Sequence, residues 1–150
     1  MKKITSFTVD HTKLDEGIYV SRVDADITTY DLRTRKPNSG DVMDNVTMHT
    51  FEHMFATFVR NSEIAEDVIY FGPMGCQTGF YLLVRNADNE NVLAITKDIL
   101  DSITKYNGEV FGNSEIECGN FRTLNLDHAK KEAEKYLAVL NSKQHTFLYN

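Results

Sequence analysis

Residues 44–61 read DNVTMHTFEHMFATFVRN and carry a helical pattern. Asp44 or Asn45 can cap the start of a helix, because a short acceptor side chain satisfies the free backbone N–H groups there. Behind the cap, apolar residues recur at the three- and four-residue intervals that place side chains on one helical face. The sequence therefore predicts a helix over 44–61, with inward-facing residues Met48, Phe51, Phe55, Phe58 and Val59.

Extended segments flank this helix on both sides. The first 35 residues read as extended, and Ile18–Val23 and Ile27–Leu32 are especially rich in β-branched and aromatic residues. After the helix, Val68–Phe71 predicts a short buried strand that the following Gly72–Gly75 breaks. Thr78–Val84 predicts a further strand.

Two more helices are expected over Asn91–Tyr106 and Leu126–Leu140, and between them Glu109–Phe121 is expected to be irregular or a short strand. Strands and helices follow one another without a regular alternation, which favours an α+β fold. We expect a single compact domain over residues 1–150, in which a mostly antiparallel sheet packs against helices.

Size and charge exclude several classes of protein. A chain of 150 residues lies within the usual single-domain range of about 100–200 residues. Its 16 Lys and Arg against 22 Asp and Glu give a net charge of −6, which argues against a nucleic-acid partner bound through its phosphates. The sequence shows neither an apolar run long enough for a membrane helix nor a signal peptide at its start. We therefore expect a cytoplasmic protein without a membrane partner.

The predicted first helix contains the motif H-x-x-E-H, formed by His49, Glu52 and His53. Histidines four residues apart lie on one helical face, so both imidazoles can bind one metal ion. The carboxylate between them can move protons near such an ion. Two histidines at this spacing can also be ordinary core or surface residues, so the motif alone leaves both interpretations open.

The two cysteines, Cys76 and Cys118, are free to do chemistry if the compartment is reducing, although a single disulfide between them is an alternative. Cys118 lies in a turn and can complete a His₂Cys metal site with one open position. Cys76 lies between Gly75 and Gly79, where it is either a buried strand-end residue or a thiol that exchanges protons near a metal. A nearby cation favours the reactive thiolate form.

Five separated segments together resemble the S-ribosylhomocysteine lyase (LuxS) family. They occur in the same order over about residues 6–129, and the third and fourth segments in combination are specific. The segments are Ser6-Phe7 with Asp10-His11, Tyr30–Arg33 with Pro37-Asn38, His49–His53, Pro73–Tyr81 and Glu117–Asn120.

The resemblance implies a single metal-dependent lyase domain that acts on S-ribosylhomocysteine. The products are homocysteine and 4,5-dihydroxy-2,3-pentanedione, a quorum-sensing autoinducer precursor, and the reaction recycles waste of the activated methyl cycle. The implied cofactor is one divalent metal, natively Fe²⁺, with Zn²⁺ or Co²⁺ as substitutes. The implied assembly is a homodimer with active sites at the interface. The implied residues are His49, His53 and Cys118 as metal ligands, Glu52 and Cys76 as catalytic acid/base groups, and Ser6, His11, Arg33 and Arg60 as substrate-binding groups.

The chemistry of this reaction suits such a site. The C–S bond of a thioether breaks readily only when its sulfur lies β to a carbonyl. The sugar carbonyl must therefore first move along the chain by two isomerisations. Each isomerisation passes through an enediolate whose charge a divalent cation can stabilise, while protons are removed and returned. A carboxylate and a thiol, Glu52 and Cys76, suit that proton transfer, and β-elimination then releases homocysteine.

The sequence departs from the family pattern at Tyr70, where an acidic residue is usual, and at Arg35, where many members carry a cysteine. Two other functions remain as alternatives. One is a metallohydrolase in which Glu52 activates water, and the other is a paralogue that binds a metal or ligand without catalysis.

Overall fold

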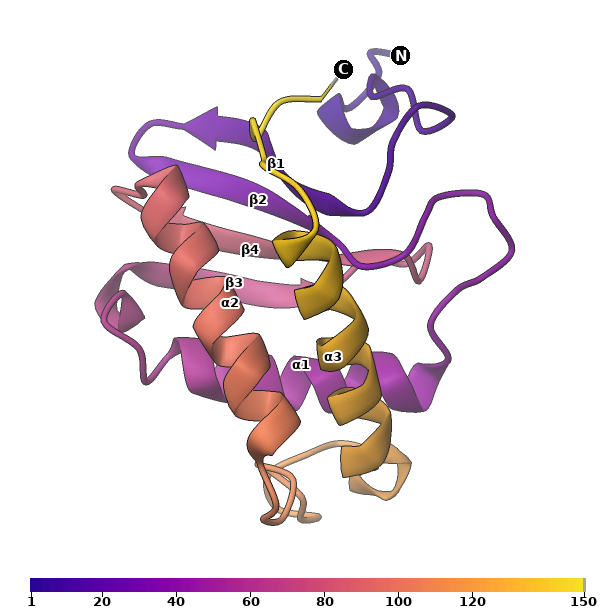
Figure 1. Ribbon diagram of the computed structural model, residues 1–150, viewed down its shortest axis with the longest axis vertical. Coiled ribbons are helices and arrows are strands. Elements are labelled where there is room, and N and C mark those ends of the chain that lie inside the picture. The colour runs from indigo at the N-terminus through magenta and orange to yellow at the C-terminus, as the bar shows by residue number, and fades with distance from the viewer. Residues whose placement is uncertain (150) are drawn as a thin grey trace.

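The computed structural model describes residues 1–149 and shows one sheet covered on one face by a layer of helices (Figure 1). The four strands are antiparallel and follow the order β1-β2-β4-β3. Within residues 1–149, three short 3₁₀ turns accompany the strands and helices. The elements in chain order are η1 (Thr5–Phe7), β1 (Gly17–Asp24), β2 (Ile27–Arg33), α1 (Asn45–Val59), η2 (Ala65–Asp67), β3 (Val68–Pro73), β4 (Gly79–Arg85), α2 (Asn89–Lys105), η3 (Phe121–Thr123) and α3 (Leu126–Asn141). The α+β class with an antiparallel sheet is confirmed.

Alternation along the strands gives the sheet two different faces. On β2, Tyr30 and Leu32 point into the core and are fully buried. Asp31 and Arg33 alternate with these two residues along the strand and point to the opposite face. Arg33 pairs with Gly79 of β4, and a Cβ atom at Gly79 would lie only 2.6 Å from the Leu32 carbonyl oxygen. Only glycine therefore lets these strands approach so closely at the end that carries Arg33.

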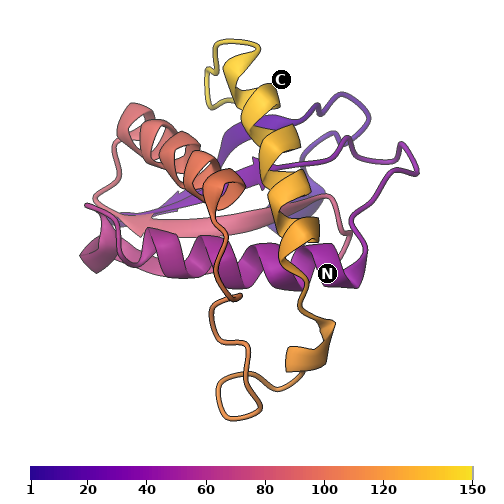
Figure 2. The same cartoon turned by 60° about the horizontal axis from the view of Figure 1, so that its bottom comes forward.

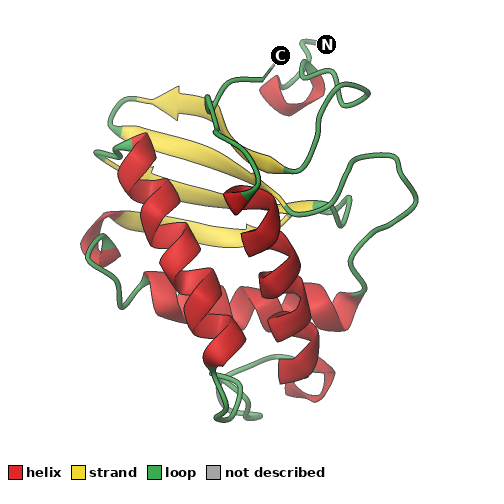
Figure 3. Cartoon of the chain, in the orientation of Figure 1, coloured by secondary structure: helices red, strands yellow, loops and turns green. Residues whose placement is uncertain are grey.

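The three helices cover the face with Tyr30 and Leu32, as Figures 1 and 3 show. Aromatic rings hold α1 against the sheet: Phe55 stacks on Phe71 with centroids 4.4 Å apart, and Phe51 stacks on Phe80 at 4.8 Å. Asp44 caps α1 by accepting a hydrogen bond from the Thr47 backbone N–H. The apolar face and the cap expected from residues 44–61 thus position this helix.

Some element boundaries differ from the sequence predictions. Gly72 and Pro73 do not break the strand but belong to β3. Proline is tolerated there because β3 is an edge strand, where a backbone N–H can be missing without loss of a hydrogen bond between strands. Residues 5–7 form a 3₁₀ turn rather than extended chain. α2 begins at Asn89, two residues early, because Asp88 supplies its cap. None of the helices within residues 1–149 is long and apolar enough to cross a membrane.

Candidate active site

Three potential metal ligands converge between α1 and the segment that links α2 to α3. His49 and His53 lie one turn apart on α1, with ring centroids 4.7 Å apart. The linking segment, drawn in orange in Figure 2, extends past α1 and brings Cys118 to these rings. The Cys118 sulfur lies 3.4 Å from His49 Nε2, and the ligand atoms of all three residues lie within 4.8 Å of one another. This set can hold one metal ion.

The linking segment also fixes which nitrogen of each histidine is available. His53 Nδ1 donates to the Phe111 carbonyl oxygen at 2.8 Å. His49 Nδ1 lies 2.6 Å from the Thr123 hydroxyl oxygen, which itself donates to the Asn120 carbonyl and so accepts from the ring. Both Nδ1 atoms therefore carry the proton, and both Nε2 lone pairs are free for a metal.

The surroundings favour the metal-binding forms of these ligands. Burial, followed by the neighbouring His53, lowers the pKa of His49 and so favours the neutral ring that binds a metal, while the nearby Glu52 carboxylate opposes this shift. The Asn120 backbone N–H donates to the Cys118 sulfur at 3.4 Å and helps to hold the sulfur in place. A His₂Cys donor set with imidazole and thiolate ligands fits a borderline-soft divalent ion.

Backbone conformation around Gly112 shapes the metal site. Gly112 has a φ of +72°, and a Cβ atom there would lie 3.0 Å from His53 Nδ1. The chain can therefore turn after Phe111 and present its carbonyl to His53 only with glycine at this position.

Cys76 lies in the turn between β3 and β4 and is exposed, so the alternative of a buried structural cysteine is wrong. Its sulfur lies 3.0 Å from the Thr78 hydroxyl and 3.9 Å from Arg33 Nη1. Gln77 adopts a positive φ of 67° and exchanges two hydrogen bonds with Met43, just before α1. The turn that carries Cys76 is thereby held against the start of the helix that carries the metal ligands. Both cysteines are free thiols, as expected.

Arg33 forms a buried ion pair beside Cys76. Its side chain and that of Asp31 are 3% and 1% exposed, and the two are joined by Nε–Oδ1 and Nη2–Oδ2 bonds of 3.1 and 2.6 Å. The remaining nitrogen, Nη1, donates to the Thr78 hydroxyl at 2.7 Å. Burial opposes the charge of Arg33, but the Asp31 carboxylate outweighs it and raises the pKa of Arg33. A permanent positive charge therefore lies next to the Cys76 thiol.

The other expected substrate residues lie elsewhere in the single chain. Ser6 lines a hollow of about 290 Å³ on the sheet face away from the helices, together with Tyr70 and Tyr81. His11 Nδ1 contacts the Val9 carbonyl within the N-terminal segment at 2.9 Å. Arg60, at the end of α1, donates to carbonyl oxygens at the start of β3. Within residues 1–149, no hydrogen bond or salt bridge joins these groups to the metal ligands.

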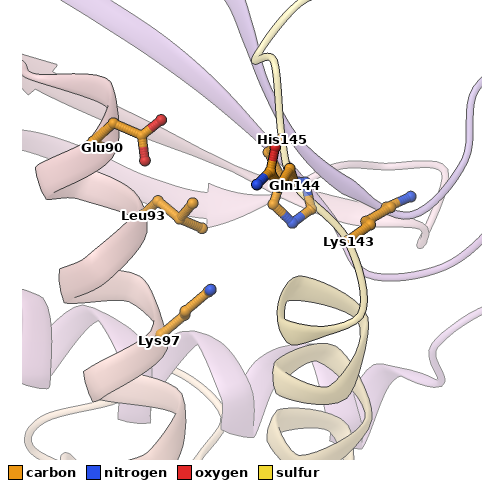
Figure 4. A pocket seen from close by; sticks show the side chains of 6 residues that line it. All are labelled: Glu90, Leu93, Lys97, Lys143, Gln144 and His145. Carbon is orange, nitrogen blue, oxygen red and sulfur yellow. The ribbon is translucent and has the colours of Figure 1, made fainter.

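A further hollow, of about 360 Å³, lies between α2 and the segment after α3 (Figure 4). Two amines, Lys97 and Lys143, a carboxylate, Glu90, and His145 line it. It contains none of the residues that the sequence predicts for the site. We therefore do not assign the reaction to it.

Sequence reasoning missed the groups that orient the reactive side chains. Asp31 and Thr78 lie inside the quoted segments but carried no role, and Thr123 and the Phe111 carbonyl were not singled out. A backbone carbonyl has no signature in a sequence. The alternating pattern of β2 could have suggested that Asp31 and Arg33 share one face.

Comparison with known proteins agrees with this arrangement. The model of the family described as S-Ribosylhomocysteinase (LuxS) matches residues 4–147. A protein of Borreliella afzelii (strain PKo) named S-ribosylhomocysteine lyase is 47% identical over 148 residues, which cover 95% of this chain and 94% of that protein. A protein of Desulfotalea psychrophila with the same name is 46% identical over 91% of this chain and 89% of its own length. Another of that name, from Finegoldia magna, is 45% identical over 99% of each chain. Because a family match over nearly the whole chain accompanies this identity, the chain belongs to the S-ribosylhomocysteinase (LuxS) family.

Proposed function

We propose that this chain is a carbon–sulfur lyase that cleaves S-ribosylhomocysteine to homocysteine and 4,5-dihydroxy-2,3-pentanedione. The observation that carries the proposal is the pairing of a His₂Cys ligand set beside Glu52 with a separate, Arg33-flanked thiol, Cys76. A hydrolase that activates water with one carboxylate has no use for the second group. We place the reaction in the recycling of methyl-cycle waste, with the diketone as an autoinducer precursor.

The proposed catalytic residues supply two distinct proton-transfer groups. Glu52, on α1 next to His53, removes and returns protons at one side of the sugar chain. Cys76 does so at the other side, and the Arg33 guanidinium lies 3.9 Å from its sulfur. The Thr78 hydroxyl, 3.0 Å from the sulfur, completes the surroundings of the thiol. We assign Arg33 the role of placing a positive charge beside the Cys76 thiol, in addition to substrate binding.

We propose that His49, His53 and Cys118 hold one divalent metal ion, with Fe²⁺ as the native metal and Zn²⁺ or Co²⁺ as substitutes. The free Nε2 atoms and the backbone hydrogen bond to the Cys118 sulfur support this ligand set. When bound, such an ion supplies positive charge that stabilises a developing enediolate. Metal analysis of protein purified without oxygen identifies the native ion. The need for two free thiols, Cys76 and Cys118, supports the cytoplasm as its compartment.

We propose further that the working unit is a homodimer with active sites at the interface. η1 contacts β1 while α1 contacts β3, at opposite edges of the sheet. Ser6, expected to bind substrate, lies on the face away from the helices, whereas the metal ligands belong to the helix layer. Two copies that meet through their sheet faces can supply both sets to one substrate. Exposed apolar groups on that side, such as Tyr70 at 52% exposure, support such a contact.

The decisive experiment measures thiol release from S-ribosylhomocysteine by Fe²⁺-loaded protein under anaerobic conditions. Glu52→Ala and Cys76→Ala should each lower the rate about a hundredfold or more, because each removes one acid/base group. Glu63→Ala, an exposed carboxylate just beyond α1, should leave the rate unchanged. Parallel incubations with peptides and amides test the hydrolase alternative. Absence of thiol release from the metal-loaded parent protein would refute the proposed function, and normal release by Cys76→Ala would refute the role of Cys76.

A further inference from the structure

The segment after α3 returns to the sheet and pairs with β1. The Val20 backbone N–H donates to the Phe147 carbonyl oxygen at 2.8 Å, and the Phe147 side chain is buried. In Figure 1 this segment, in yellow, runs from the end of α3 to the β1 edge. The proposed function gives this segment no role.

Tyr149, at the end of this segment, reaches the buried ion pair beside Cys76. Its ring stacks on Tyr19, with centroids 5.1 Å apart and planes inclined by 19°. Its hydroxyl donates to Asp31 Oδ2 at 2.6 Å. Burial, and then the Asp31 charge, raise the pKa of Tyr149 well above its ordinary value, so the hydroxyl remains a donor at any pH used for an assay.

Continuous polar contacts therefore run from Tyr149 to the thiol. Asp31 Oδ2 accepts from both Tyr149 and Arg33 Nη2, each at 2.6 Å. The opposite end of the guanidinium, Nη1, contacts Thr78 and faces the sulfur of Cys76. Arg33 and the Tyr81 phenol are ionisable groups that interact with this thiol. Burial first, then Asp31 and Cys76, raise the pKa of Tyr81, while Arg33 opposes that shift.

We propose that Tyr149 is a positioning residue that holds the Asp31–Arg33 pair in place and so sustains the reactivity of Cys76. The proposal rests on the proposed function for its catalytic meaning. Without the hydroxyl, Asp31 keeps more of its negative charge and draws the Arg33 guanidinium towards itself. Both effects weaken the positive field at the sulfur.

The test follows alkylation of Cys76 by iodoacetamide as a function of pH in metal-loaded protein. Peptide mapping separates Cys76 from Cys118. Tyr149→Phe keeps the stack on Tyr19 but removes the hydroxyl. We expect the pH midpoint of its alkylation to move to a higher value. At a pH below the midpoint, the alkylation rate should fall about threefold. The effect is modest because only part of the free energy of the lost charge-assisted hydrogen bond reaches the sulfur through the ion pair.

Two controls separate this effect from general loosening. Tyr19→Phe removes a hydroxyl from the other ring of the same stack, one that donates to Asp15 rather than to Asp31. Leu148→Ala changes an exposed side chain of the same segment. Both should keep the parent midpoint. An unchanged midpoint in Tyr149→Phe, or an equal shift in the controls, would overturn the proposal. The readout needs no substrate, so it stands apart from the thiol-release assay that tests the lyase function.

Discussion

At the residue scale, metal binding depends on which ring nitrogen of each histidine carries a proton. The Thr123 hydroxyl accepts from His49 Nδ1 and so directs Nε2 towards Cys118. Thr123→Val keeps the shape of the side chain but removes this acceptor. We expect the affinity for Zn²⁺ or Co²⁺ to fall about tenfold, the usual effect of losing such a supporting partner.

Competition with a chromophoric chelator measures this affinity. Thr104→Val serves as the matched control, because the Thr104 hydroxyl donates to the Asp101 carbonyl within α2, away from the histidines. The same affinity in Thr123→Val and the parent protein would show that Thr123 does not orient His49.

At the element scale, the Arg35–Glu132 ion pair ties α3 to the loop between β2 and α1. Glu132 is 2% exposed and receives two bonds from the Arg35 guanidinium, of 3.0 and 2.6 Å. The bond to Glu132 is the main cause that raises the pKa of Arg35. Arg35→Ala should lower the free energy of unfolding by about 3–5 kcal/mol, because it leaves a buried carboxylate unpaired.

Urea denaturation tests this expectation. Replacing both partners, as Arg35→Met with Glu132→Leu, should cost much less, since no buried charge is then left alone. Arg22→Ala breaks a pair with Asp24 in which both side chains are 52% exposed, and should change stability by less than about 1 kcal/mol. Similar losses from Arg35→Ala and Arg22→Ala would contradict the structural role of the buried pair.

The elements show what a sequence reveals and what it does not. The stripe on α1 was predictable because one helical face meets the core, and the histidine spacing followed from the same period. The turn around Cys118 left a place at the metal site open, and the family resemblance implied that place. The contacts of Thr123 and Tyr149 join segments 74 and 118 residues apart, and no local pattern encodes such distant pairs. Pro73 was assigned to a break because nothing local marks β3 as an edge strand.

At the scale of the whole molecule, the proposed dimer separates metal binding from turnover. The three ligands come from one chain and one layer, so each copy alone should bind its metal. The expected substrate residue Ser6 instead lies on the face that we assign to the dimer, where Leu83 is a neighbour in the same hollow. Leu83→Arg places a charge in that apolar surface and should yield monomers in analytical ultracentrifugation.

Such monomers should keep one metal per chain, yet release homocysteine at least about a hundredfold more slowly, because the groups that position the substrate are then missing. Ala138→Arg, an equal change on the exposed side of α3, should remain dimeric and active. Monomers of Leu83→Arg with full activity would show that one chain suffices, and monomers without metal would show that the ligand set needs the second copy. A Leu83→Arg protein that is monomeric, binds its metal and has lost turnover is the one result that fits the proposed site. In that site the metal ligands come from one protomer and substrate contacts come from its partner.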